Sequence, residues 1–238
     1  MIVGLIGKKQ SGKDTIATLF QSIGDASTKS REVISDSLAW SLKMTISEML
    51  GLDKSLLFGS NEDKETLTDY RWESLPMDIR IKNANLIILL RNKNIIQRID
   101  YRDDLGPYSA VPREGRMTIR DILQVVGTDI YRSYFDSSVH TRTVLSRNKS
   151  IGEKSILIIS DIRFFDEIDL LSSSGDAHFI GLTRSPLIDL HDSEKGFDYA
   201  ELSRIYMDKF HLIDNANMTL QETIDEATRV WNSITGEI

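Results

Sequence analysis

A short stretch near the N-terminus has the residue types and the spacing of a phosphate-binding loop. Gly7 and Gly12 frame the pattern G-x-x-x-x-G, and Lys13 follows the second glycine directly. Glycines allow the backbone to curl so that successive amide groups point inward at an anion, and a lysine at this position can reach the outer phosphates of a nucleotide. The expected chemistry is therefore the binding of a nucleoside triphosphate, with Lys13 neutralising the phosphates during transfer.

A buried strand and an amphipathic helix must hold this loop in place. Residues 2–6 form an apolar run with the length of a buried parallel strand, and Ile16, Leu19, Phe20 and Ile23 recur at helical spacing after the loop. The N-terminus of that helix adds a dipole that favours an anion. Strand, glycine-rich loop and helix together are the context that a P-loop requires.

Asp14 departs from the usual P-loop motif, in which a serine or threonine offers its hydroxyl to magnesium. Asp14 either holds Mg²⁺, directly or through water, or is only a favourable negative charge at the start of a helix. The amides of Ser11, Gly12, Asp14 and Thr15 are expected to bind the phosphates of ATP, together with the Thr15 hydroxyl. The alternative for Thr15 is an ordinary residue of the first helical turn.

Apolar runs alternate with helical patterns along the rest of the chain. Further strands are expected at residues 32–35, 155–160, 178–182 and 212–213. Helices are expected at about residues 38–50, 119–126, 130–135, 138–147 and 219–231. Asp36 or Ser37 is expected to cap the first of these helices, which ends at Gly51, and Gly127 is expected to end the second. This alternation indicates an α/β fold with a central, mainly parallel sheet.

In such sheets, ligands bind beyond the carboxyl ends of the strands. That rule predicts that Lys43, Asp161, Arg163 and Arg184 gather with the P-loop at one edge of the sheet. Asp161, at the end of a strongly apolar strand, is placed to lie near bound magnesium; the alternative is a cap for the helix that follows.

Two stretches do not follow the alternation. Residues 76–117 have no clear period and are expected to be an insertion. Residues 185–200 are polar and contain Pro186 and Gly196, as expected of a mobile lid. Because the rest of the pattern is continuous, residues 1–238 are expected to form a single domain.

Composition and charge exclude several classes of protein. The chain has 238 residues and a net charge of −7, which argues against sequence-independent binding of nucleic acid. It contains no cysteine, so disulfides and thiolate metal sites are excluded, as suits a reducing compartment. The apolar run at residues 86–90 is too short to cross a membrane. Because a strand is expected directly after Met1, we expect no signal peptide.

Six short blocks of sequence carry a more specific signal. They are residues 7–15 with G-K-D-T, 38–43 with L-A-W-S-L-K, 120–129 with R-D-I-L-Q-V-V-G-T-D, 160–167 with S-D-I-R-F-F-D-E, 182–186 and 191–194. In content and order these blocks resemble the bacteriophage deoxynucleoside monophosphate kinases, a family of P-loop kinases, and the resemblance covers most of the chain. In this family Asp14 is an ordinary feature, whereas Gln10 stands where an arginine is common and His140 where relatives often carry a tryptophan suited to stacking on the base.

The resemblance implies a three-layer P-loop kinase fold with helical lid and monophosphate-binding parts. It implies that the protein uses ATP and Mg²⁺ to phosphorylate deoxynucleoside monophosphates (dNMPs) to diphosphates, which supplies nucleotides for phage DNA synthesis. The expected setting is the cytoplasm of the infected host cell. The expected partners are small nucleotides and a second copy of the chain in a homodimer, without nucleic acid or membrane.

The resemblance also implies roles for individual residues. The catalytic residues are Lys13, Asp161 and Arg163, Arg184 joins the P-loop residues in binding ATP, and Asp14 and Asp161 hold the metal. The residues expected to bind the dNMP are Lys9, Leu42, Lys43, Arg71, Arg120, Gly127, Thr128, Arg132, His140 and Glu167. Six of them have a plainer alternative: Lys43 and Arg120 as solvated helix charges, Glu167 as part of an exposed helix face, and Leu42, Gly127 and Thr128 as ordinary packing and helix termination.

Other functions remain open from the residues themselves. One is another small-molecule P-loop kinase, and another is a P-loop NTPase that acts with nucleic acid or remodels a protein. A nucleotide sensor without catalytic activity is a third. The acidic charge, the length of the chain and the lack of a clear strand that ends in a D-E pair argue against the NTPase.

Overall fold

The computed structural model describes residues 1–26, 32–83, 85–88, 108–152, 154–185 and 196–236. The chain divides into two compact units, one formed by residues 1–51 and 126–238 and the other by residues 52–125. The predicted lid at residues 185–200 lies mostly outside the described residues, as does the middle of the predicted insertion, residues 89–107. Both assignments, and the single domain, stay predictions.

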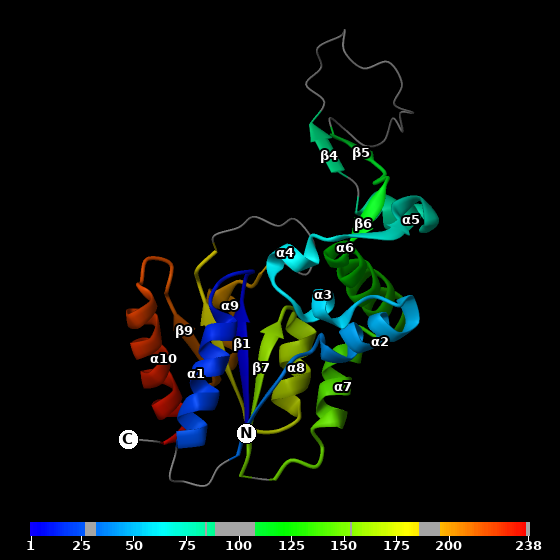
Figure 1. The fold of residues 1–238 in the computed structure, drawn as a ribbon. Coiled ribbons are helices and arrows are strands. Elements are labelled where there is room, and N and C mark those ends of the chain that lie inside the picture. Colours follow the sequence, from blue (N-terminus) through cyan, green and yellow to red (C-terminus); the bar gives the residue numbers. More distant parts are fainter. Residues whose placement is uncertain (27–31, 84, 89–107, 153, 186–195, 237–238) are drawn as a thin grey trace. The chain divides into compact units, whose positions relative to one another are not determined.

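A five-stranded sheet is the centre of the first unit (Figure 1). The strands lie in the order β2-β7-β1-β8-β9, and all neighbours are parallel. Their bounds are β1 Ile2–Gly7, β2 Val33–Asp36, β7 Ile156–Ile162, β8 Ala177–Leu182 and β9 Phe210–Ile213. The predicted α/β fold with a central parallel sheet is therefore confirmed, and it is consistent with a P-loop kinase.

Successive side chains of each strand point to opposite faces of the sheet and divide the core into two clusters. On β1, Val3 and Leu5 belong to one cluster, whereas Ile2 and Ile6 belong to the other. Because both faces are covered, the strands are mainly apolar rather than alternating with polar residues. This double burial explains why the strands could be recognised in the sequence as short continuous apolar runs.

Helices cover both faces of the sheet (Figure 1). The helices α1, Lys13–Ala26, and α10, Leu220–Thr235, bury their apolar sides in the cluster that contains Val3, and Phe20 stacks on Trp231 with 4.6 Å between ring centroids. The other cluster includes side chains of three helices: α7 Val139–Arg147, α8 Phe165–Ser173 and α9 Tyr199–Tyr206. The helix α2, Trp40–Leu50, contacts α7 and ends, as predicted, at Gly51, which has φ 65°.

The prediction that Gly127 ends a helix is wrong. The helix α6, Ile119–Gln124, continues directly into a π-helix, Val125–Phe135, that runs through the glycine. Gly127 does not have the positive φ of a helix C-cap. Its hydrogen instead makes room for a neighbour, because a Cβ atom there would lie 2.6 Å from Cδ2 of the buried Leu42. The glycine therefore serves a close contact between two helices.

The second unit consists of short elements. Its helices besides α6 are α3 Lys54–Phe58, α4 Asn61–Lys64 and α5 Met77–Lys82. Its strands form two antiparallel pairs, β3 Leu67–Arg71 with β6 Arg116–Thr118 and β4 Asn85–Ile88 with β5 Tyr108–Val111. A reciprocal capping box between Thr118 and Asp121 starts α6. Among the described residues of both units, no helix is long and apolar enough to span a membrane.

Candidate active site

The glycine-rich loop joins the end of β1 at Gly7 to the start of α1 at Lys13. Gln10, with φ 60°, and Gly12, with φ 103°, turn the chain through the left-handed region. The Nζ atom of Lys13 donates hydrogen bonds to the carbonyl oxygens of Gly7 at 2.6 Å and Lys8 at 2.7 Å. The Lys13 side chain therefore folds back over the loop, where its Nζ can contact an anion bound at the loop.

Charged side chains of both signs share the space around Lys13. Burial and the nearby Arg163 lower the pKa of Lys13 to about 8, against the opposing effect of Asp14 and Asp161. Burial also lowers the pKa of Lys43, which interacts with the same two carboxylates and with Arg163. The structure thus brings together five of the predicted site residues at the carboxyl ends of β1 and β7, and three of them are cations that can face an anionic substrate.

Asp161, near the end of β7, holds the start of α2 in place. Its Oδ1 accepts a hydrogen bond from the amide of Leu38 at 2.7 Å, and its Oδ2 accepts from the amide of Ala39 at 3.0 Å and from the Ser37 hydroxyl at 3.1 Å. The prediction that Asp36 or Ser37 caps this helix is wrong, because Ala39 occupies the N-cap position without a side-chain cap. The plainer alternative for Asp161, a cap for the helix that follows it, is also wrong.

Glu167 and Arg132 stabilise the short segment around Phe164 between β7 and α8. The Glu167 side chain, 3% exposed, accepts hydrogen bonds from the amides of Arg163 at 2.8 Å and Phe164 at 3.1 Å, and Arg132 pairs with it at 3.1 Å. Arg132 also binds both carboxylate oxygens of Asp166 and lies over the Phe164 ring. Burial raises the pKa of Glu167 to about 7, against the opposing effect of Arg163's amide and Arg132. Glu167 is thus not on an exposed helix face.

Leu42, Gly127 and His140 pack against one another beside the π-helix. His140 is 8% exposed, and its Nε2 lies 3.1 Å from the carbonyl oxygen of Gly127, so that Nε2 carries the hydrogen. Burial lowers the pKa of His140, which keeps the ring neutral. The Thr128 carbonyl accepts a hydrogen bond from the Ser133 hydroxyl at 3.0 Å. Gly127 thus lies against both Leu42 and His140 within the first unit.

Arg71 and Arg120 lie in the second unit, apart in the chain from the P-loop. Arg120 is held by Glu65, 2.6 Å from Nε, and by Asn61, 3.0 Å from Nη2, and its side chain is 17% exposed. These two contacts leave the Nη1 side of the guanidinium for another acceptor. Arg71 is more exposed, at 55%, and pairs with Glu73. Arg120 therefore has the more defined geometry of the two.

Arg184 follows β8 and is tied to the turn between β9 and α10. Its amide donates to Oδ1 of Asn215 at 2.9 Å, and its guanidinium donates to the carbonyl oxygens of Asn215 and Met218. Asn215 is fully buried and also donates from Nδ2 to the carbonyl oxygen of Ser11 in the P-loop, at 2.9 Å. The predicted site residues did not include Asn215. Its signal in the sequence is the pair Asp214-Asn215, which lies between a short strand and a capping box and resembles an N-D-G-type turn of the phage kinases.

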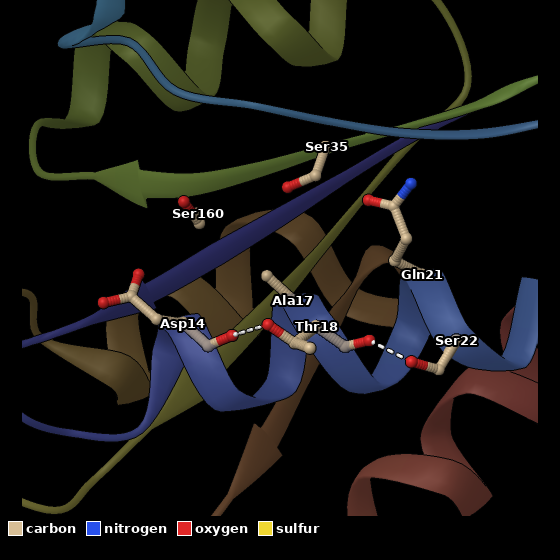
Figure 2. Close-up of a pocket in the computed structure, with 7 residues that line it drawn as sticks. All are labelled: Asp14, Ala17, Thr18, Gln21, Ser22, Ser35 and Ser160. Carbon is tan, nitrogen blue, oxygen red and sulfur yellow. Dashed lines mark hydrogen bonds between the residues drawn. The ribbon is translucent and has the colours of Figure 1, made fainter. Parts of the chain in front are cut away.

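A pocket of about 390 Å³ beside α1 suits a hydrated cation (Figure 2). Asp14, at the start of α1, faces it, with the hydroxyls of Ser35 on β2 and Ser160 on β7 across the opening. Within the described residues no group of three or more histidine, aspartate or glutamate side chains could hold a metal. Mg²⁺ does not need such a group, because it commonly keeps several waters and uses one or two carboxylates with substrate phosphates. The residues present therefore fit a magnesium ion.

Comparison with known proteins gives two matches. The model of a family described as deoxynucleotide monophosphate kinase matches residues 1–216. A protein of Acanthamoeba polyphaga mimivirus, provisionally named deoxynucleotide monophosphate kinase, is 24% identical over 241 residues. That match covers 91% of this chain and 98% of the relative, so it extends through both compact units.

Proposed function

The chain belongs to the deoxynucleotide monophosphate kinase family, as its six sequence blocks predicted, and we propose that it transfers the γ-phosphoryl group of ATP to a dNMP. The products are the deoxynucleoside diphosphate and ADP. The observation that carries the proposal is the gathering of Lys13, Lys43 and Arg163 with Asp14 and Asp161 beside the P-loop. Phosphoryl transfer depends mainly on positioning and charge stabilisation, which such a group of side chains supplies.

The P-loop forms the donor side of the site. The amides from Ser11 to Thr15 bind the phosphates of ATP at the N-terminus of α1, and Lys13 exchanges its contacts with Gly7 and Lys8 for phosphate oxygens. Arg184 lies at the end of β8, next to this loop in the sheet. Asp14 with Ser160 would hold a Mg²⁺ ion, which would neutralise charge on the phosphates, whereas both oxygens of Asp161 accept hydrogen bonds from the amides of Leu38 and Ala39.

Arginine and lysine side chains form the acceptor side. Arg163 and Lys43 grip the dNMP phosphate or flank the transferred group, together with Lys9. Glu167 positions Arg163 through its backbone amide. We propose that Leu42, Gly127, Thr128 and His140 shape the wall of the nucleotide pocket and that Arg71 and Arg120 contact the dNMP, whereas Arg132, paired with two carboxylates, acts through Glu167.

The direct test is a coupled assay of ADP formation with ATP and each dNMP or ribonucleoside monophosphate in turn. We expect ADP formation that depends on a dNMP. A monophosphate-independent ATPase activity that DNA stimulates would contradict the proposal and favour the NTPase alternative. Activity only with another phosphate or alcohol acceptor would favour a different small-molecule kinase. In size-exclusion chromatography with light scattering, the same preparation should have the mass of a homodimer. The biological role that corresponds to the proposed reaction is the supply of nucleotides for phage DNA synthesis in the cytoplasm.

The lowered pKa of Lys13 predicts that nucleotide binding weakens above pH 8. The free protein loses the Lys13 proton at about pH 8, whereas bound phosphates raise this pKa, so binding takes up a proton above pH 8. The affinity for ADP should fall about tenfold between pH 7 and pH 9. Calorimetry in two buffers with different ionisation heats measures both quantities. Lys43→Ala should keep this pH dependence, and equal affinities at pH 7 and pH 9 would assign a normal pKa to Lys13.

Replacing Arg120 with alanine should weaken dNMP use more than ATP use. The loss of a charged hydrogen-bond donor to phosphate typically costs about 1.5–3 kcal/mol, which corresponds to a KM for the dNMP raised about tenfold or more. The KM for ATP should change less than about twofold. Arg116→Ala is the control, because Arg116 lies in the same unit and its exposed side chain pairs with Asp69. Equal rises in the KM values for the dNMP and for ATP would contradict the assignment of Arg120 to dNMP binding.

A further inference from the structure

Asn215 occupies a fully buried position between the P-loop and the end of β8. Its Nδ2 donates to the carbonyl oxygen of Ser11 at 2.9 Å, and its Oδ1 accepts from the amide of Arg184 at 2.9 Å. A carbonyl oxygen can only accept and a backbone amide can only donate, so the orientation of this side chain is fixed by its partners. No other side chain would make both bonds with the same geometry except aspartic acid in its protonated form.

The bond to Ser11 fixes the direction of one peptide group in the loop. The C=O and N–H of a trans peptide point in opposite directions, so a Ser11 carbonyl directed at Asn215 aims the amide of Gly12 to the other side. Gly12 has φ 103°, and a Cβ atom on it would lie 3.8 Å from Nδ2 of Asn215. The asparagine amide therefore packs directly against the back of the loop, at the residue whose amide is expected to bind phosphate.

The same turn holds Arg184. Its guanidinium donates to the carbonyl oxygens of Asn215, at 3.3 Å from Nε, and Met218. The amide of Asn215 in turn bonds to the carbonyl oxygen of Ile213 on β9 at 2.9 Å. One buried residue thus connects β9, Arg184 just after β8, and the loop after β1, which are neighbouring parts of the sheet.

We infer that Asn215 is a positioning residue for the phosphate donor: its side-chain amide fixes the Ser11–Gly12 peptide and, with it, the affinity of the loop for ATP. The inference rests on the proposed function for the identity of the donor. It assigns Asn215 no contact with the reacting atoms. The defect caused by its loss falls on the donor side, because none of its hydrogen bonds reaches Arg163, Lys43 or the π-helix.

The test compares Asn215→Leu and Asn215→Ala with the neighbouring control Asp214→Asn. In Asn215→Leu the shape is nearly kept, but the side chain can neither donate to the Ser11 carbonyl oxygen nor accept from the Arg184 amide. We expect the KM for ATP and the Kd for ADP to rise about tenfold or more, with the KM for the dNMP changed less than about twofold. Asp214, whose exposed Oδ1 accepts from the Thr183 hydroxyl at 2.6 Å, should tolerate substitution without this selective effect.

Two outcomes would overturn the inference: equal rises in the KM values of both substrates, or unchanged ADP affinity in a folded Asn215→Leu protein. ADP titration does not depend on turnover, so it still tests Asn215 if the wild-type chain makes no ADP from any dNMP and the proposed function fails. If neither variant folds, hydrogen exchange of the Asn215 side-chain amide in the wild type decides. Slow exchange, retained when ADP binds, supports the inference, and exchange at the rate of free asparagine overturns it.

Discussion

Replacing Lys13 with alanine is expected to lower kcat/KM for dNMP phosphorylation by at least about 10³-fold, the size of effect that a single charge at the transferred phosphoryl group has in related chemistry. Lys13 is placed at the start of α1 with its Nζ 2.6 Å from the Gly7 carbonyl, at the rim where the loop amides converge. Alanine would leave those amides but remove the cation that neutralises the outer phosphates. ADP formation in the coupled assay measures the loss.

The fold should survive this substitution. Keeping a lysine charged in a largely buried position is unfavourable, as the lowered pKa of Lys13 indicates. The carbonyl oxygens of Gly7 and Lys8 that lose their donor lie in a loop that water can reach, so the free energy of unfolding should change by less than about 1 kcal/mol. Thermal unfolding tests this expectation, and Lys154→Ala, on an exposed residue, is the matched control. Undiminished turnover in Lys13→Ala would exclude the P-loop from the reaction.

The central sheet and the P-loop could be predicted because their signals are local. An apolar run before Gly7 and helical spacing after Thr15 are enough to identify β1, the loop and α1. The same holds for the capping box at Thr219, which opens α10 where the sequence predicts it. In each case the residues that determine the structure are neighbours in the chain.

The contacts that join these elements could not be predicted, because they link residues far apart in the chain. Asp161 accepts hydrogen bonds from the amides of Leu38 and Ala39, which precede α2 and lie more than 120 residues earlier, and Asn215 bonds to a carbonyl 204 residues away. Periodicity also failed at Gly127, where a glycine typical of a helix end serves a close contact with Leu42. Glu167 is a similar case, because only its buried contacts with Arg132 and with the amides of Arg163 and Phe164 distinguish it from an exposed helical glutamate.

Replacing Asp161 with asparagine should reduce both stability and catalysis. The amide group can accept from only one of the two backbone donors without placing its own NH₂ against the other, so the start of α2 loses at least one hydrogen bond to Leu38 or Ala39. A lost bond to a charged acceptor corresponds to about 1.5–3 kcal/mol in the free energy of unfolding. Because α2 carries Lys43 and the charge of Asp161 is gone, kcat/KM should fall about 100-fold.

The pH dependence separates the electrostatic effect of Asp161 from its effect on α2. Asp161 raises the pKa of Lys13, so its neutralisation lowers that pKa further below the value of about 8 in the wild type. The pH at which ADP affinity begins to fall should therefore move to a lower value in Asp161→Asn. Asp198→Asn is the matched control, because Asp198 caps α9 by accepting from the amides of Ala200 at 2.9 Å and Glu201 at 3.2 Å. This control should lose stability without shifting the pH dependence of ADP affinity. If that pH dependence is also unshifted in Asp161→Asn, Asp161 only stabilises the start of α2.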